Sequence, residues 1–462
     1  MNPLLVRRAP HMPPAPHVPV AIVGAGACGL TAALRLRDQG VQCVLLERDA
    51  APSGSTALSS GFIPAAGTRL QKSLAIEDSA ELFAQDIQAK AHGDAAPHLV
   101  DAYVHAVAQA IDALELKHGI PFEILDGFLY PGHHTRRMHA VPERTGAALM
   151  ARLERAASRA GADIVADAVV RELWADPADR MLGLSYERPD GTLEQLACDV
   201  LVLACNGFGG NTAMVGELLP AMREAVFAGH VGNDGSAITW GRQIGARLAD
   251  LGGYQGHGSW AVPQGALMSW AMMMEGGVQI NTQGLRFHDE TQGYSEAAVH
   301  VLDQPGRIAW NVLDEPLLQM ARSFPDFVEL EKAGALKTAT DAAALARLIG
   351  CDEAVLRNTL SATQSGGADA FGRRFRRPLA APFFAVKVTG ALFHTQGGLD
   401  IDARCRVLKT DGSPFGNLIA AGGAARGVSG NAVWGYLSGN GLLSAIGGGW
   451  IAAGSAAVQL AA

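Results

Sequence analysis

Val18-Pro-Val-Ala-Ile-Val-Gly24-Ala-Gly26-Ala-Cys-Gly29 is the stretch of sequence that decides the fold of this chain. Its first six residues are apolar and mostly β-branched, which predicts a buried strand that ends at Val23. A G-x-G-x-x-G turn follows. Apolar residues at helical spacing come next, so the order is strand, tight turn and helix.

A second apolar run, from Gln42 to Leu46, ends at Glu47, 18 positions after the last glycine of the turn. The two runs and the helix between them make a βαβ unit of about 30 residues. In such a unit Gly24 permits the turn, Gly26 lets a pyrophosphate approach the helix, and Gly29 brings the helix close to the strand. Glu47 can accept hydrogen bonds from ribose hydroxyls. The combination predicts a dinucleotide site.

Composition sets the class of protein around this unit. The chain has 462 residues, of which 48% are hydrophobic and 18% charged. This length and composition imply a globular protein of about two to four domains. The formal net charge of -8 has the wrong sign for a protein that neutralises phosphates, so nucleic acid is excluded as a main partner.

The cysteines and the two ends of the chain indicate the cellular compartment and whether the chain crosses a membrane. The six cysteines lie far apart, without C-x-x-C spacing, which predicts reduced thiols, no metal site and a cytoplasmic location. Residues 1–17 hold five prolines and predict a flexible tail. Residues 427–462 carry no charge, but their Gly, Ala, Ser and Asn content favours a closely packed buried helix over a membrane span. No membrane partner is expected.

Elements along the rest of the chain alternate in the manner of an α/β fold. Helices are predicted at residues 80–90, 100–118, 146–161, 341–348 and 352–361, and strands at 163–168, 199–204, 384–388, 399–401 and 418–421. The composition changes from about residue 235, so we expect an inserted domain at 235–377 within a first domain formed by 18–234 and 378–462. The arginine run at 373–377 is interpreted as a solvated boundary rather than an anion site.

Three further segments indicate which dinucleotide binds. The polar loop Ser53–Gly61 follows the acid and is long enough to run beside a flavin. Leu201–Gly210 and Leu418–Gly423 are strands that end in glycine turns. At these points the chain resembles the fumarate reductase/succinate dehydrogenase flavoprotein superfamily, over essentially Val18 to Ala453.

The resemblance implies FAD, a two-piece Rossmann-like FAD-binding domain and an inserted α+β capping domain. Membrane-complex members attach FAD through a histidine in the loop that here reads Ser55 to Gly61. This loop has no histidine, so we expect noncovalent FAD. The positions that the resemblance assigns to the cofactor are Gly24, Gly26, Gly29, Glu47, Arg48, Ser55, Thr56, Ser60, Gly61, Val169, Ala204, Gly207, Gly422, Gly423, Gly441 and Leu442.

The capping-domain motif occurs in both reductases and dehydrogenases of the superfamily, and the residues that follow it separate the branches. Gly284–Glu290 matches G-x-R-F-x-(N/D)-E and assigns a site arginine, Arg286. Soluble fumarate reductases carry their proton-donor arginine in the region that here reads Trp310–Gln319, where no arginine occurs. The segment Thr291–Glu296 is instead similar to the 3-ketosteroid 1-dehydrogenase branch, in which a tyrosine at the position of Tyr294 removes the proton alpha to a ketone.

The carboxyl-terminal motif agrees with this branch. Tyr436 stands where fumarate reductases have a carboxylate-binding arginine. The resemblance implies that the hydroxyl of Tyr436 and the backbone N–H of Asn440 together bind the ketone oxygen of the substrate. His394, in His-Thr-Gln-Gly-Gly, matches a superfamily turn that lines the substrate site. Most tyrosines in a chain of this length only pack, and a packed histidine is the alternative for His394. Arg426 fits a carboxylate clamp or an ion pair, and Tyr130 a site hydroxyl or a basic loop.

These features predict an FAD-dependent dehydrogenase that introduces a double bond next to the ketone of a cyclic substrate, either a small alicyclic ketone, with or without a carboxylate, or a 3-ketosteroid. The resemblance implies that Tyr294 is the base and flavin N5 the hydride acceptor. The electron acceptor stays unidentified. Two alternatives remain: a fumarate-reductase-like ene-reductase or tricarballylate-type dehydrogenase, and a non-catalytic flavoprotein subunit.

Overall fold

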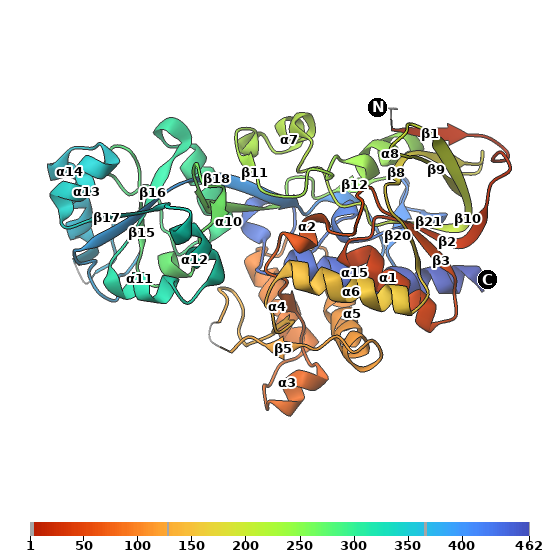
Figure 1. Ribbon diagram of the computed structural model, residues 1–462, viewed down its shortest axis with the longest axis horizontal. Coiled ribbons are helices and arrows are strands. Elements are labelled where there is room, and N and C mark those ends of the chain that lie inside the picture. Colours follow the sequence, from red (N-terminus) through yellow and green to blue (C-terminus); the bar gives the residue numbers. More distant parts are fainter. Residues whose placement is uncertain (1–3, 127–128, 365–366, 462) are drawn as a thin grey trace. The chain divides into compact units, whose positions relative to one another are not determined.

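The computed structural model describes residues 4–126, 129–364 and 367–461, and these form two compact units (Figure 1). The first unit comprises Met1–Leu218, Gly229–Tyr254 and His394–Ala462, and the second comprises Leu219–Ala228 and Gln255–Phe393. Both mix helices and strands, which confirms the predicted α/β class.

The first unit is built on a sheet whose central strand is β10 (Leu193–Leu203). This strand pairs in parallel with β2 (His17–Val23) on one side and β21 (Pro414–Ala420) on the other. The parallel ladder continues from β2 to β3 (Cys43–Leu46) and then to β7 (Asp163–Val165). Most inner residues of β2, β3, β10 and β21 are buried, which explains their apolar sequence, whereas the edge strand β7 is partly exposed.

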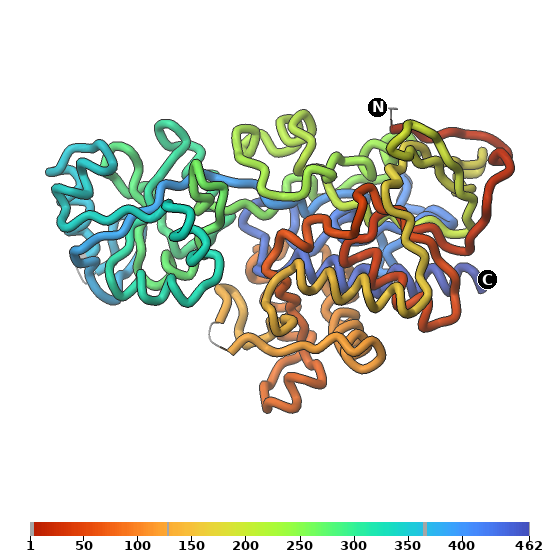
Figure 2. The backbone as a smooth tube through the Cα atoms, viewed as in Figure 1, coloured from red at the N-terminus to blue at the C-terminus, as the bar shows by residue number. Residues whose placement is uncertain are grey.

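The sheet extends through an antiparallel part, in which β10 pairs with β9 (Met181–Glu187) and β9 with β8 (Val169–Ala175). The chain also returns to it at both ends, with β1 (Leu5–Arg8) parallel to β8 and β20 (Arg406–Leu408) antiparallel to β21 (Figure 2). The predicted flexible tail is therefore wrong for residues 5–8. The side chain of Arg7 donates to Glu172 at 2.8 Å and helps to hold this edge strand. Residues 1–3 lie outside the described part of the chain.

Helices cover this sheet, and several short elements complete the unit. The long ones are α1 (Ala27–Asp38), α4 (Ala80–Lys90), α5 (Pro97–Leu116), α6 (Gly146–Arg159) and α15 (Asn440–Leu460). The short ones are α2 (Gly54–Ala57), β4 (Ile63–Pro64), α3 (Arg69–Ser73), β5 (Glu123–Ile124), β6 (Met138–Ala140), α7 (Thr212–Leu218), α8 (Ser236–Ile244), β12 (Leu248–Ala249), β19 (Gly398–Leu399) and the 3₁₀ turns Gly422–Ala424 and Val433–Gly435.

The second unit has its own sheet, in the order β14 (Ala266–Leu267), β13 (Tyr254–Ala261), β18 (Phe383–Thr395), β16 (Ala309–Leu313) and β15 (Val278–Ile280). Strands β11 (Val226–Phe227) and β17 (Leu336–Ala339) also pair with β18. Its helices are α9 (Ala271–Met274), α10 (Tyr294–Leu302), α11 (Glu315–Ala321), α12 (Pro325–Lys332), α13 (Ala342–Ile349) and α14 (Glu353–Ser361), with 3₁₀ turns at Pro220–Met222, Pro305–Arg307 and Ala362–Gln364.

The boundaries of this unit differ from the predicted 235–377. Residues 235–254 belong to the first unit, because α8 packs against β1 and β19. Residues 378–393 belong to the second unit, because β18 is the strand at the centre of its sheet. The predicted domain also included residues 365–366, which lie outside the described part of the chain.

The interpretation of the arginine run at 373–377 as a solvated boundary is corrected as well. Arg373 is 3% exposed and donates to the carboxylate of Glu290 and to the carbonyl of Gly277. Arg377 binds Asp314 through two nitrogens. Two arginines of the run therefore pair with carboxylates inside the second unit, and only part of it faces solvent.

Helix α15 lies against α1 at backbone distance. A Cβ added at Gly449 would lie 2.3 Å from the carbonyl oxygen of Cys28, closer than two such atoms can approach. By length and hydropathy α15 could also cross a membrane, and 56% of its most apolar window is buried inside the structure. The small residues of α15 thus allow the helix to pack directly on α1.

We expect Gly449→Ala to lower the free energy of unfolding by about 1–3 kcal/mol, because the new methyl group meets fixed backbone. Gly454→Ala, in the same helix, is the matched control. Its methyl group would lie 3.1 Å from the guanidinium of Arg35, which can move, and alanine favours the helix by about 1 kcal/mol. Urea denaturation followed by circular dichroism measures both. Equal midpoints for the two variants would contradict the packing argument.

Candidate active site

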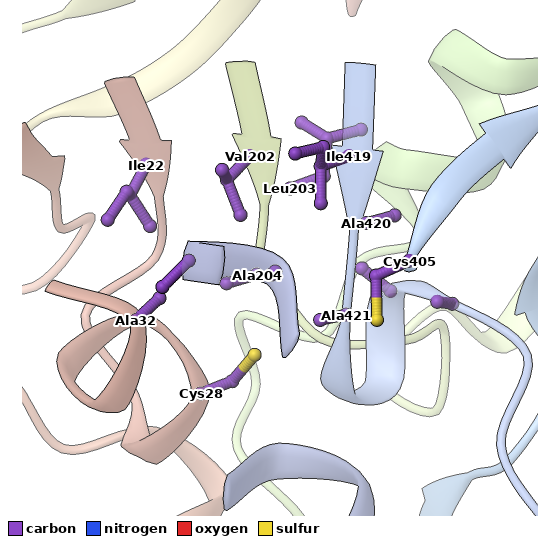
Figure 3. Packing of buried hydrophobic residues seen from close by; sticks show 14 of the residues in the cluster. Ile22, Cys28, Ala32, Val202, Leu203, Ala204, Cys405, Ile419, Ala420 and Ala421 are labelled. Carbon is purple, nitrogen blue, oxygen red and sulfur yellow. The ribbon is translucent and has the colours of Figure 1, made fainter. Parts of the chain in front are cut away.

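Three glycine turns meet at one edge of the first unit's sheet. Strands β2, β10 and β21 are parallel neighbours, and they end next to Gly24, Ala204 and Gly422. Figure 3 shows Ile22, Val202 and Ile419 on these three strands, and Cys28 of α1 below them in the view. In open α/β sheets this edge, outside the carboxyl ends of the strands, is where nucleotides bind.

In the turn after β2, backbone atoms crowd Gly24 and Gly29, whereas the space beside Gly26 is open. Gly24 has φ +103°, and a Cβ there would lie 2.6 Å from the carbonyl oxygen of Ala204. A Cβ at Gly29 would lie 2.0 Å from the carbonyl oxygen of Gly24, whereas one at Gly26 would meet nothing within 4 Å. No side chain caps α1 at Gly26. The N–H groups of its first turn are therefore oriented to receive an anion.

Glu47 connects this turn to the next strand. Its carboxylate accepts from the backbone N–H of Ala25 at 2.9 Å and from that of Asp49 at 3.1 Å. Burial raises the pKa of Glu47, although the two N–H groups act in the opposite direction. Its backbone carbonyl accepts from Ala168, which places the following residue, Val169, near the same corner. Glu47 therefore holds the turn and leaves oxygen lone pairs for ribose hydroxyls.

Arg48 connects the end of β3 to a neighbouring loop. Its guanidinium donates to the carbonyl of Gly232 at 2.5 Å and to the carboxylate of Asp234 at 3.2 Å. These contacts tie the strand end to the loop at residues 230–234. The assignment of Arg48 to the cofactor stays a prediction.

The polar loop at residues 53–61 is anchored beside the second turn. The hydroxyl oxygen of Ser55 accepts from the side-chain amides of Asn206 at 3.0 Å and Asn233 at 2.9 Å. The carbonyl of Thr56 accepts from Ser59. Gly61 has φ +73° and lies against the backbone of residue 145, and Ser60 is exposed.

The second and third turns fit each other only with glycine. A Cβ at Gly207 would lie 2.0 Å from the hydroxyl of Thr395, and one at Gly423 would lie 2.2 Å from the side-chain oxygen of Asn206. The side-chain oxygen of Asn206 thus occupies the space that a side chain at position 423 would enter. The three turns thus form one continuous backbone cradle.

A cluster of polar side chains lies in the same unit, and we call its members His394, Gln396, Ser429, Tyr436 and Asn440 the His394 cluster. The rings of His394 and Tyr436 meet edge to face, with centroids 5.4 Å apart. A Cβ at Gly441 would lie 2.8 Å from Nε2 of His394 and 3.6 Å from the hydroxyl of Tyr436. Both polar atoms therefore lie close to the backbone of Gly441, which precedes the half-buried Leu442 in α15.

Both groups are neutral at pH 7. Burial lowers the pKa of His394 to about 4. Burial also raises the pKa of Tyr436 above its ordinary value, and the backbone N–H groups of Gly441 and Gly439 partly oppose this. Those N–H groups make the phenolic oxygen an acceptor. The pair can therefore hold an uncharged oxygen atom by hydrogen bonding.

The predicted role of the Asn440 backbone is wrong. Its N–H donates to the carbonyl of Leu437 at 3.0 Å and closes the turn before α15. The side chain of Asn440 instead donates to Ser429 at 2.9 Å. The N–H groups that face the hydroxyl of Tyr436 belong to the two neighbouring glycines.

Arg426 forms an ion pair. Its guanidinium binds both oxygens of Asp250, at 2.6 and 3.2 Å, and approaches Asp400 at 3.5 Å. These two carboxylates neutralise the arginine. Of the two roles left open by the sequence, the ion pair is the one observed.

Arg286 also pairs within the protein. In the second unit it donates to both oxygens of the fully buried Glu290, at 2.9 and 2.6 Å, and to Asp369. Burial alone would raise the pKa of Glu290, but Arg286 and Arg373 hold it below its ordinary value. The motif G-x-R-F-x-D-E therefore forms an internal ion cluster. Arg286 is held in this cluster by two carboxylates, and its assignment as a catalytic residue stays a prediction.

Tyr294 is the first residue of α10, and its ring stacks on His257. The centroids are 4.9 Å apart and the planes differ by 15°. Nδ1 of His257 accepts from the N–H of Ser259, and burial lowers the pKa of His257 to about 3. Edges of Trp270 and Phe393 contact the same imidazole. Tyr294 is thus oriented by a neutral aromatic platform.

Tyr130 lies in a loop that packs on the segment carrying Tyr436. Its ring meets Phe62 edge to face at 6.2 Å. A Cβ at Gly132 would lie 2.7 Å from Leu437, and the imidazole of His133 is 2.9 Å from the carbonyl of Ser438. The loop lines a small pocket with Arg137 and Met138, among others. Tyr130 therefore borders the region of the His394 cluster.

The structure thus brings His394, Tyr436 and Gly441 together in the first unit, while Tyr294 and Arg286 belong to the second. Sequence reasoning missed Gln396, Ser429 and His257. Gln396 stands inside the H-T-Q-G-G motif and Ser429 in an uncharged segment, where only their polarity distinguishes them. Within the described residues no group of three or more His, Cys, Asp or Glu side chains could hold a metal ion.

Comparisons with known proteins agree with this geometry. The family model described as an FAD binding domain matches residues 19–442. The NADH:fumarate oxidoreductase of Klebsiella pneumoniae (strain 342) is 28% identical over 420 residues, which cover 89% of this chain and 45% of that protein. The 4-oxocyclohexanecarboxylate 2-dehydrogenase of Sinomonas cyclohexanicum is 24% identical over 511 aligned positions, covering 88% and 87% of the two chains.

Among solved structures, the 3-ketosteroid-Δ4-(5α)-dehydrogenase of Rhodococcus jostii RHA1 has a TM-score of 0.79 at 23% identity. The match covers 99% of this chain and 100% of that one. This similarity shows the fold.

This chain belongs to the FAD-binding domain family. Together with the reductases and dehydrogenases among its relatives, the family identifies it as an FAD-dependent oxidoreductase of the fumarate reductase superfamily. The residues present fit the cofactor. Open space at Gly26 and the uncapped start of α1 suit a pyrophosphate, and the carboxylate of Glu47 suits a ribose.

We expect acid denaturation to release FAD into solution, because the loop at residues 55–61 has no histidine to form a covalent bond. The measurement is flavin absorbance in the supernatant and in the pellet after precipitation with acid. A flavoprotein with histidine-linked FAD is the control, since its colour stays in the pellet. Flavin that remains with the precipitated protein would contradict noncovalent binding.

Proposed function

We propose that this protein is a dehydrogenase that introduces an α,β double bond next to the ketone of a cyclic substrate. The substrate is a small alicyclic ketone, with or without a carboxylate, or a 3-ketosteroid. FAD, when bound, supplies the acceptor for the hydride that leaves the β carbon. The side chains of this protein supply the remaining functions, namely removal of the α proton and stabilisation of the carbonyl oxygen.

The observation that carries the proposal is that the two candidate arginines of the site form ion pairs within the protein. Arg286 and Arg426, the arginines that a dicarboxylate substrate would use, are both bound by carboxylates of the protein. The polar atoms that converge beside Gly441 belong instead to two neutral groups, His394 and Tyr436. Neutral hydrogen-bond donors match a ketone oxygen better than they match a carboxylate.

The proton chemistry needs these donors. A proton alpha to a ketone is too weakly acidic for a tyrosine base unless the developing enolate oxygen is stabilised, and preorganised donors contribute several kcal/mol to this. In our proposal Tyr436 and His394 hold the oxygen and Tyr294 removes the α proton. The aromatic contacts with His257 restrict the orientation of the Tyr294 ring, which favours a defined position for its hydroxyl.

A relative named for a cyclic ketone, 4-oxocyclohexanecarboxylate, supports the substrate class, and the alignment covers most of both chains. The six cysteines are free thiols, which supports work in a reducing compartment such as the cytoplasm. We propose no membrane or nucleic-acid partner, and the electron acceptor stays unidentified.

The second candidate is an ene-reductase that acts on fumarate-like acids, and the relative named as an NADH:fumarate oxidoreductase favours it. The chain spans 45% of the length of that protein. Anaerobic mixing of the oxidised protein with cyclic ketones, 3-ketosteroids and saturated carboxylates separates the two. We expect loss of flavin absorbance with ketones only. Bleaching by carboxylates, or rapid reoxidation of reduced flavin by fumarate and not by enones, would support the ene-reductase.

We expect Tyr294→Phe to slow flavin reduction by ketone roughly a hundredfold or more, because it removes the proposed base and keeps the ring on His257. Stopped-flow absorbance measures the reduction, and exchange of the α hydrogens in deuterated water measures proton removal. Tyr186→Phe is the matched control. That hydroxyl donates to Glu194 on the first unit's sheet, and its loss should leave the rate unchanged. A parental rate in the Tyr294 variant would exclude this residue as the base.

A further inference from the structure

We propose that Gln396, Ser429 and Asn440 form a buried relay that fixes the proton of His394 on Nε2, so that this nitrogen donates a hydrogen bond to the substrate oxygen. The identity of that oxygen as a ketone rests on the proposed function. The protonation state itself follows from the hydrogen bonds of the first unit.

The relay runs behind the imidazole as a chain of three contacts. The amide nitrogen of Asn440 donates to the hydroxyl oxygen of Ser429 at 2.9 Å. That hydroxyl donates to the side-chain oxygen of Gln396 at 2.8 Å. The amide nitrogen of Gln396 then lies 3.2 Å from Nδ1 of His394.

The direction of the hydrogen bonds in this relay decides which tautomer His394 adopts. An amide nitrogen can only donate, so Nδ1 of His394 must accept from Gln396. A neutral imidazole whose Nδ1 accepts carries its proton on Nε2. The carbonyl of Thr395, at 3.5 Å, is the competing partner for Nδ1 and stands at the outer limit of hydrogen bonding.

Burial explains why the hydrogen bonds of the relay keep this direction. Gln396, Ser429 and Asn440 are between 0 and 4% exposed, so water cannot compensate for a lost contact. With the present direction, the atom left without a partner is a carbonyl oxygen, Oδ1 of Asn440. In the reversed direction an amide NH₂ would occupy that position. Two buried donors without acceptors cost more than one oxygen without a donor.

The consequence appears on the opposite side of the ring. Nε2 of His394 lies close to the backbone of Gly441, as does the hydroxyl of Tyr436. As an N–H it attracts a carbonyl oxygen, whereas as a lone pair it would repel one. Gln396, Ser429 and Asn440 therefore act as positioning residues, and they determine that the site receives a hydrogen-bond acceptor.

Histidine nitrogen resonances test this directly. The FAD-loaded, oxidised protein is labelled with ¹⁵N-histidine, and His394 is assigned as the signal lost in His394→Asn. We expect the Nε2–H tautomer in the parent between pH 6 and 8, in agreement with a pKa of about 4. An Nδ1–H tautomer in the parent would overturn the relay.

Substitution of Gln396 tests the cause. In Gln396→Glu the carboxylate can only accept, so the proton should move to Nδ1 or the imidazole should become charged below a raised pKa. In Gln396→Met both tautomers should be populated, and flavin reduction should slow about tenfold to a hundredfold, the usual effect of losing a partner that orients a functional histidine. The exposed Gln243→Glu adds the same charge and should leave the His394 signals unchanged.

His394 resonances that stay parental in both Gln396 variants would overturn the proposal. Ser429→Ala gives a second route to the same answer if either variant is unstable, because it removes the group that orients the Gln396 amide. The spectra need no substrate. The predicted tautomer in a protein that fails to oxidise any ketone would therefore refute the proposed function and keep the relay.

Discussion

Direct contact of backbone with backbone is the constraint on which the first unit depends. At Gly24 the chain passes so close to Ala204 that no side chain fits, and at Gly449 helix α15 meets the carbonyl of Cys28 in the same way. These contacts bring segments from the beginning, middle and end of the sequence to one edge of the sheet. The cradle for a nucleotide is therefore made of main chain, and glycine is required where the segments touch.

Arginines pair with carboxylates of the protein in both units, and this pairing shapes the chemistry. The second unit buries Glu290 between two arginines, and the first unit neutralises Arg426 with Asp250. Breaking such a pair would leave a buried charge without a partner, at a cost of about 3–5 kcal/mol. Arginines held in this way are poor ligands for a substrate, which is why our proposal assigns recognition to uncharged groups such as His394 and Tyr436.

The features that could be predicted from the sequence are those coded locally. The strand, the turn and the acid at Glu47 lie within about 30 residues, so spacing alone identifies them. The four residues of β1 become a strand only through β8, and Arg373 finds Glu290 83 positions away, so neither partner is visible in the local pattern. The N–H of Asn440 closes a four-residue turn with the carbonyl of Leu437, and the sequence motif does not show this turn. Gln396 carries no charge to mark it.

The interrupted order of the first unit has a consequence for biosynthesis. Strand β21 and helix α15 come from residues 414–460, after the whole of the second unit has been made. Until then the face of α1 that receives α15 lies open, and an exposed apolar surface of this kind favours aggregation of a nascent chain. Pairing between such distant segments also slows folding. The second unit, whose sheet is complete once residue 393 has been made, can fold on the ribosome while the first waits for its last helix.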